Sequence, residues 1–268
     1  MKGGRRLAAL VVALAVALGG CGAPAGSASV APLELDVFAA ASLRDAMTAA
    51  ATRYDASHPG VHVTASFDSS TALRTQIEQG APADVFASAD TTNPQHLVDA
   101  GLAVGPVTSF ARNSLVIVVA DSSRTRVRDP RDLATPGVRI AAAGPDVPIT
   151  RYADQVVAGL ARLPGYPPDY VAAVSANVVS REDNVRAALA KVELGEADAA
   201  IVYETDARSS KATGRVEIPA AANVVATYGA VAVTASRHRA EAAAFVAWLG
   251  GAEGTAALAP FGFAAPSP

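Results

Sequence analysis

The sequence predicts an α/β fold with mostly parallel sheets. Short apolar, β-prone runs alternate along the chain with segments whose apolar residues recur at helical spacing. Several of these helical segments end at a glycine, for example Gly80 and Gly101, which is typical of a helix C-terminus. We find no internal repeat. In α/β proteins of this kind, ligands bind at the carboxyl ends of the strands.

The first third of the chain after residue 32 is predicted to hold three strand–helix pairs. Residues 33–41 are apolar and β-prone, and the segment after them places Leu43, Met47 and Tyr54 on one helical face. The predicted strands are 33–41, 61–67 and 83–89, and the predicted helices are 42–56, 70–79 and 92–100.

The remaining chain continues the same alternation. Residues 115–120 are entirely apolar, as in a strand that is buried on both faces. Pro148 suits the first turn of a helix. The predicted strands are 115–120, 138–143, 174–179, 199–203 and 224–234, and the predicted helices are 148–163, 181–194, 240–249 and 252–259.

The N-terminal residues have the pattern of an export signal with a lipid attachment site. Arg5 and Arg6 precede an unbroken apolar run that is short for a membrane span, and Cys21, the only cysteine, follows small residues. We expect residues 1–20 to be a signal peptide, Cys21 to be acylated, and residues 21–32 to be a flexible tether. The protein would then be exported and anchored to the outer face of the cell membrane. An ordinary signal peptide whose apolar segment ends near a cysteine is the alternative.

The composition excludes several classes of function. The chain has 22 Lys and Arg against 25 Asp and Glu, a net charge of −3, which does not suggest a nucleic-acid-binding protein. It lacks a nucleophile elbow, a phosphate-binding P-loop and a dinucleotide-binding glycine motif. His58 and His62 flank a Pro-Gly turn, so we interpret them as exposed residues and not as a metal site. We expect no cofactor and no enzymatic activity, with a secreted hydrolase built from scattered residues as the less supported alternative.

Hydroxyl residues follow two of the predicted strands, where a helix begins. Ser42 has capping-box spacing with Asp45, and residues 67–71 contain a second hydroxyl cluster. Helix N-termini offer free N–H groups and a partial positive charge, so two such turns after consecutive strands could bind an anion in one crevice. For either serine alone, a simple N-cap role is the better explanation of the pattern.

Five segments occur in the order found in a known family. They are 38–43 (FAAASL), 67–71 (FDSST), 76–90 (QIEQGAPADVFASAD), 182–186 (EDNVR) and 200–203 (AIVY). Together they resemble the substrate-binding protein of the bacterial molybdate ABC transporter, over nearly the whole chain from residue 35 to residue 263.

The resemblance implies a two-lobed periplasmic-binding-protein fold of type 2, with the ligand cleft between the lobes. Lobe one would comprise residues 33–115 and 230–265, and lobe two residues 116–229. The implied function is capture of molybdate or tungstate and its delivery to an ABC permease by a monomeric protein. Molybdenum would be present only within the bound oxyanion.

The resemblance also implies the binding residues. Ser42 and Ser70 would each donate a hydroxyl and a backbone N–H, Ile149 and Val185 a backbone N–H, and Tyr203 its phenol hydroxyl. Without the resemblance, the last three would be interpreted as core residues. This set contains donors only, which suits molybdate and tungstate because both are fully deprotonated near neutral pH.

Two questions remain open at this point. Sulfate is also a fully deprotonated tetrahedron, so a binding protein for sulfate or another small oxyanion is the alternative, and only cavity size separates the two. Ser69 is the alternative to Ser70 in the second turn. Asp68, where the family often has a small neutral residue, would repel an anion from inside the cleft, so we expect it to face solvent or to cap the helix from outside.

Overall fold

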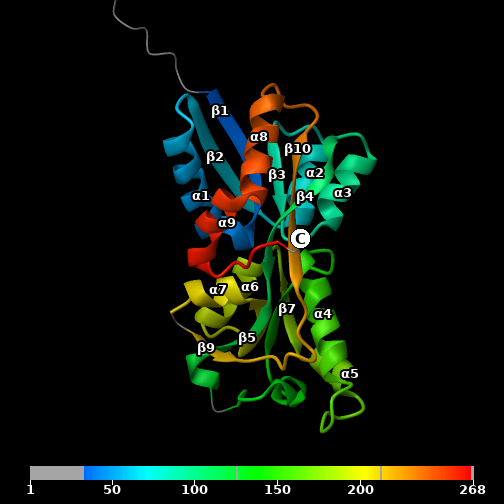
Figure 1. The fold of residues 1–268 in the computed structure, drawn as a ribbon. Coiled ribbons are helices and arrows are strands. Elements are labelled where there is room, and N and C mark those ends of the chain that lie inside the picture. The colour runs from blue at the N-terminus through cyan, green and yellow to red at the C-terminus, as the bar shows by residue number, and fades with distance from the viewer. Residues whose placement is uncertain (1–32, 125, 212, 267–268) are drawn as a thin grey trace, which may run out of the picture. The chain divides into compact units, whose positions relative to one another are not determined.

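The computed structural model describes residues 33–124, 126–211 and 213–266, which fold into two five-stranded sheets with helices (Figure 1). The strand orders are β2–β1–β3–β10–β4 and β7–β6–β8–β5–β9. We call the first sheet with helices α1, α2, α3, α8 and α9 lobe one, and the second sheet with helices α4 to α7 lobe two. Residues 1–20 and 21–32, the predicted signal peptide and tether, lie outside the described residues.

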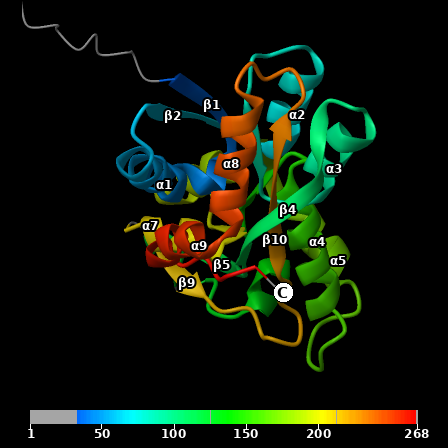
Figure 2. The same ribbon diagram turned by 45° about the horizontal axis from the view of Figure 1, so that its top comes forward.

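Lobe one contains strands β1 (Leu33–Ala40), β2 (Val61–Asp68), β3 (Val85–Ser88), β4 (Ala103–Asn113) and β10 (Ala226–Val233), and helices α1 (Arg44–Ser57), α2 (Ser70–Glu78), α3 (Thr92–Asp99), α8 (Arg239–Gly250) and α9 (Ala252–Leu258). Strand β1 pairs in parallel with β2 and β3, whereas β10 pairs antiparallel with β3 and β4. Figure 2 shows α8 beside β10, and Phe245 of this helix meets Tyr54 of α1 edge-on at 4.9 Å.

Lobe two contains strands β5 (Leu115–Ala120), β6 (Ile140–Ala143), β7 (Val178–Glu182), β8 (Ala199–Tyr203) and β9 (Thr213–Val216), and helices α4 (Pro148–Leu160), α5 (Tyr170–Ala176), α6 (Val185–Glu193) and α7 (Glu204–Ser209). Strand β6 pairs in parallel with β7 and β8, and β5 pairs antiparallel with β8 and β9. Every residue of β5 is buried, in agreement with its unbroken apolar sequence.

The chain passes between the lobes twice. Ser114 joins β4 to β5, and residues 217–225 join β9 to β10. The Asn223 side chain links these two connections, because it accepts the N–H of Leu115 at 3.2 Å and donates to the Leu115 carbonyl at 2.8 Å.

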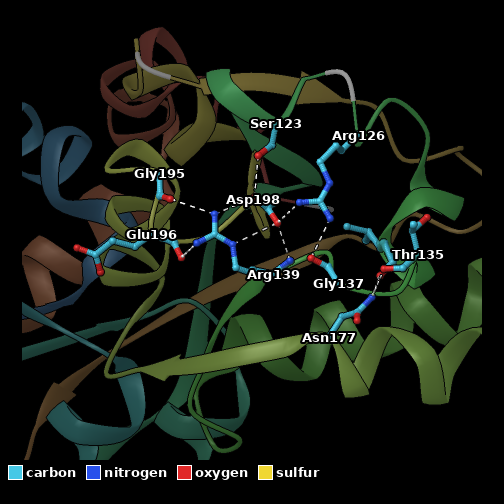
Figure 3. A network of polar contacts seen from close by, with 10 residues as sticks. Ser123, Arg126, Thr135, Gly137, Arg139, Asn177, Gly195, Glu196 and Asp198 are labelled. Atoms are coloured by element: carbon cyan, nitrogen blue, oxygen red, sulfur yellow. Dashed lines mark hydrogen bonds and ion pairs between the residues drawn. The ribbon is translucent and has the colours of Figure 1, made fainter.

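A buried carboxylate organises the distal part of lobe two (Figure 3). Asp198, which precedes β8, accepts hydrogen bonds from the Ser123 hydroxyl at 2.7 Å, the Arg139 backbone N–H at 2.8 Å and the Arg139 guanidinium at 2.9 Å. Arg126 adds an ion pair at 3.4 Å. Burial opposes ionisation, but the hydrogen bonds from Arg139 and Ser123 outweigh it and lower the pKa of Asp198 to about 2.

The predicted alternation of strands and helices is confirmed, with four corrections. Both sheets are mixed and not mostly parallel, because β10 and β5 run antiparallel to their neighbours. Residues 174–179 end helix α5 and begin β7, and do not form one strand. Helix α6 begins at Val185 and not at residue 181, because the Asn184 side chain caps it. Strands β4 and β9 and helix α7 were not predicted; β4 contains Gly105 and Pro106, which an edge strand tolerates.

In the part of the chain that the structure describes, no single helix is long and apolar enough to cross a membrane. Helix α8 and residues 252–261 meet the length and composition criteria only as a pair bent by 67°. Phe245 and Leu249 of α8 are fully buried, so the apolar face of this helix belongs to the core of lobe one.

Candidate anion-binding site

A small pocket between the lobes brings together all five residues that the sequence analysis proposed. Ser42 and Ser70 line it from lobe one, and Ile149, Val185 and Tyr203 line it from lobe two. Each is buried. The fold therefore places the five residues where one ligand could contact all of them, although their role in binding remains a proposal.

Ser42 lies in a 3-10 turn between β1 and α1, and a chain of hydrogen bonds orients its hydroxyl. Its Oγ atom lies 3.0 Å from the hydroxyl oxygen of Tyr228. The Tyr228 hydroxyl accepts a hydrogen bond from Asn113 Nδ2 at 3.4 Å. Tyr228 can therefore donate its own proton to Ser42, which leaves the Ser42 proton available to a ligand.

The predicted capping box of Ser42 and Asp45 is wrong. Helix α1 begins at Arg44, and neither this helix nor the preceding 3-10 turn has a side-chain cap. The 3-10 turn shifts the helix start by two residues, and Asp45 instead pairs with Arg186 of lobe two at 2.7 Å.

The two serines at the start of α2 have different roles. Ser69 is the N-cap, and its Oγ atom accepts the N–H of Ala72 at 3.4 Å. Ser70 is the first helical residue, and its Oγ atom accepts the N–H of Ala89 at 3.0 Å. The Ser70 hydroxyl is thus held in place by an incoming donor while its own proton remains free to donate.

Helix α4 presents one backbone donor at its start. Pro148 has no N–H, and the N–H of Thr150 bonds to the Val147 carbonyl at 3.0 Å. The Ile149 N–H is therefore the donor of this turn that the helix does not use, and it lies at the positive end of the helix dipole.

Helix α6 offers a second backbone donor by the same logic. The side chain of its N-cap, Asn184, accepts the N–H groups of Arg186 and Ala187, each at 3.1 Å. The cap leaves the N–H of Val185 without an acceptor within the helix. The first residues of α2, α4 and α6 all line the pocket, so the positive N-terminal ends of three helices meet there.

Tyr203 contributes an unsatisfied hydroxyl. Its side chain is buried at the end of β8, and its hydroxyl has no hydrogen-bond partner among the described residues. Burial, reinforced by the nearby Tyr228 and Tyr152, holds the pKa of Tyr203 well above its usual value. The phenol therefore keeps its proton and can donate it, and an unpaired buried hydroxyl costs about 1–3 kcal/mol until a ligand accepts from it.

No charged side chain lines this pocket. Asp68, whose orientation the sequence left open, accepts the N–H of Ser69 at 2.7 Å and the amide of Asn184 at 3.2 Å. Asp68 is thus not among the residues that line the pocket, and it links the N-cap residues of α2 and α6 without capping α2 itself. Arg151 of α4 forms an ion pair with the buried Asp90. The positive charge of Arg151 is therefore neutralised by Asp90 and not available to an anion in the pocket.

A larger cavity of about 200 Å³ lies in lobe two and is lined by residues of β6, α4 and α5. Alanine, valine and isoleucine side chains form most of its wall, and Arg181 and Asp154 provide its charged groups. Its surface lacks the convergent donors of the smaller pocket, so we do not assign the anion to it.

Of the two histidines, His62 is exposed, as interpreted, whereas His58 is half-buried. His58 stacks on Tyr54 at 3.8 Å, and His62 pairs with Asp55 at 2.7 Å. Within the described ranges, no group of three or more His, Cys, Asp or Glu side chains could hold a metal ion.

Sequence analysis missed the residues that orient the donors. Asn184 had a usable signal, since an asparagine just before an amphipathic helix is a preferred N-cap. Tyr228 and Asn113 had none, because each lies in a strand. Tyr228 meets Ser42, and Asn113 meets Tyr228, only once the sheet is assembled in the order β1–β3–β10–β4.

Two α/β lobes with a donor-lined pocket between them are typical of a solute-binding protein. The model of the family described as bacterial extracellular solute-binding proteins matches residues 35–264, and the chain belongs to this family. It is 37% identical over 265 residues to a molybdate-binding protein of Mycobacterium tuberculosis strain H37Rv, covering 97% of this chain and 96% of that protein. The resemblance inferred from the sequence motifs is thereby confirmed.

Two further relatives support the same placement. A putative ABC transporter substrate-binding lipoprotein of Bacillus subtilis strain 168 is 33% identical over 263 residues, covering 97% of this chain and 96% of that protein. The solved structure of the periplasmic molybdate-binding protein of Azotobacter vinelandii matches with a TM-score of 0.73 and 25% identity, covering 87% of this chain and 100% of that chain.

Proposed function

We propose that this protein captures molybdate or tungstate outside the cytoplasm and delivers the anion to an ABC import permease. The observation that carries the proposal is the charge-free pocket lined by Ser42, Ser70, Ile149, Val185 and Tyr203, whose hydroxyl and N–H groups are all able to donate. The names of the relatives support the choice of anion. We also propose that the protein is a monomer and acts as a carrier without catalysis.

A donor-only pocket matches a fully deprotonated oxyanion. Molybdate has four oxygens that accept hydrogen bonds and none that donates, so every hydroxyl and N–H in the pocket can be used. Phosphate near neutral pH still carries a proton and benefits from a carboxylate acceptor, and no Asp or Glu is among the residues that line the pocket. Each hydrogen bond to a charged group contributes roughly 1.5–3 kcal/mol, and after ordering and desolvation costs a dissociation constant from ~micromolar to ~nanomolar is expected.

A screen of anions by thermal shift tests the function. Molybdate and tungstate should raise the melting temperature, whereas sulfate at the same concentration should raise it little. Stabilisation by sulfate alone would identify a sulfate-binding protein of the same fold. No anion effect, together with turnover of an ester substrate, would favour the hydrolase alternative.

Replacing Tyr203 by phenylalanine is expected to weaken molybdate binding about tenfold, because one hydrogen bond to the anion is lost. The ligand-free variant should be at least as stable as the wild type, since the removed hydroxyl has no partner in the described structure. Calorimetric titration measures the first effect and thermal melting the second. Tyr152→Phe is the matched control, because its ring meets that of Tyr203 at 6.3 Å but does not line the pocket. Equal affinities of the two variants would remove Tyr203 from the site.

The export and anchoring of the protein complete the proposal. The family is extracellular, and we propose that a lipid on Cys21 holds this member at the outer face of the cell membrane. The name of the Bacillus subtilis relative supports a lipoprotein. Retention of a Cys21→Ser variant in the membrane fraction would place the anchor elsewhere.

We also propose that capture involves closure of the lobes. The moving bodies would be close to those predicted from the sequence, 33–115 with 230–265 against 116–229, with the second boundary at the start of β10. Donors divided between the lobes make the closed form bind more tightly than the open form, which is the condition for ligand-driven closure.

A further inference from the structure

We propose that the first turn of α6 is a clasp that sets how fast the anion leaves. Asn184 and Arg186, on either side of Val185, hold lobe one through Asp68 and Asp45. Capture of the anion by the Val185 N–H and closure of the lobes would then be one event. The inference rests on the proposed function and makes Asn184 and Arg186 positioning residues for it.

Arg186 is fixed in lobe two and reaches into lobe one. Its Nε atom lies 2.5 Å from Oδ1 of Asp206, a carboxylate that is completely buried in lobe two. Its Nη2 atom lies 2.7 Å from Oδ2 of Asp45 on α1, whose side chain is 45% exposed. Asp206 therefore holds the guanidinium in lobe two. The Arg186–Asp45 pair, the first arm of the clasp, is the contact that breaks when the lobes separate.

Asn184 forms the second arm of the clasp. Its Oδ1 atom caps α6, while its Nδ2 atom donates to Asp68 Oδ1 of lobe one at 3.2 Å. The same Asp68 oxygen accepts the N–H of Ser69 at 2.7 Å. One carboxylate thus links the N-termini of α2 and α6, the two helix starts that present Ser70 and Val185 to the pocket.

The size of the pocket connects the clasp to ligand exchange. With both arms in place, its volume is about 10 Å³, which admits roughly one water molecule. A tetrahedral oxyanion is larger, so we expect the lobes to shift relative to one another when it binds or leaves, and the clasp contacts cross the boundary that shifts. Further contacts cross between the lobes, among them those from the Thr71 hydroxyl to the Asp146 carbonyl at 2.6 Å, from the Asn113 amide to the Thr205 hydroxyl at 2.8 Å and from Arg151 to Asp90. The α6 clasp differs from these because its two residues lie on both sides of one proposed anion donor, Val185.

Stopped-flow measurement of molybdate dissociation from the full chain tests the clasp. Asp45→Ala and Asp68→Ala should each accelerate dissociation about threefold to fivefold, the range expected for exposed polar pairs. The double variant should accelerate it about tenfold, while association changes less than twofold. Both substitutions leave the Arg186–Asp206 pair intact, so the buried charge stays compensated. Asp99→Ala is the matched control, because this exposed carboxylate contacts only Gln95 of its own helix in the described contacts.

The outcomes separate the clasp from the proposed function. An unchanged dissociation rate in the double variant, with wild-type binding intact, would overturn the clasp. Absence of molybdate and tungstate binding in the wild type would overturn the proposed function instead. In that case, small-angle X-ray scattering of the ligand-free proteins decides on the clasp. The double variant should then show a larger radius of gyration than Asp99→Ala, and equal radii would contradict the clasp.

Discussion

Replacing Val185 by proline is expected to weaken molybdate binding roughly tenfold to a hundredfold, because it removes one N–H donor to the anion. Proline at this position should leave the structure of helix α6 unchanged. Val185 is the first residue of α6, where proline is favoured because the missing N–H has no acceptor within the helix. Asn184 has φ −155° and ψ 173°, an extended conformation that a residue before proline readily adopts.

Val185→Ala is the matched control for this prediction. It shortens the same buried side chain but keeps the backbone N–H, so it should bind molybdate within a few-fold of the wild type. Titration calorimetry gives the affinities, and thermal melting shows that both variants are folded. If the proline and alanine variants bind equally well, the Val185 N–H does not contact the anion.

Asp198→Asn is expected to lower the free energy of unfolding by about 2 kcal/mol at neutral pH, the equivalent of shifting a carboxyl pKa from its usual value to about 2. The variant keeps the shape of the side chain but loses the charge that Arg139 and Arg126 share. Urea denaturation measures the loss. Asp121→Asn is the control, because its side chain is 64% exposed and its pair with Arg124 should contribute little.

The lowered pKa of Asp198 also predicts how the free energy of unfolding changes in acid. The folded-state pKa of Asp198 lies below the unfolded value of 3.8, so its stabilisation is fully present above that value and is lost as the pH falls towards 2. The difference in unfolding free energy between the wild type and Asp198→Asn should therefore shrink over this interval. A difference that is independent of pH between neutral conditions and pH 2 would show that the charge of Asp198 does not stabilise lobe two.

Local patterns allowed much of the fold and part of the site to be predicted. The unbroken apolar run of β5 and the helical spacing in α1 are local, and both elements form where the sequence places them within two residues. The prediction failed for elements whose sequence patterns are weaker. Strand β4 contains Gly105 and Pro106, and Val174 belongs to α5 and not to a strand, because pairing and packing partners far along the chain decide such cases.

The alternation of strands and helices, the hydroxyl residues near the helix starts and the order of motifs that identifies the family can all be recognised from the residues alone. The orientation of the donors depends on the folded arrangement. Tyr228 meets Ser42 across 186 positions of the chain, and Asn184 meets Asp68 across 116. Composition and periodicity report only neighbours along the chain, whereas these contacts exist because two sheets bring distant helix starts to one pocket. The burial that leaves the Tyr203 hydroxyl without a partner has the same origin.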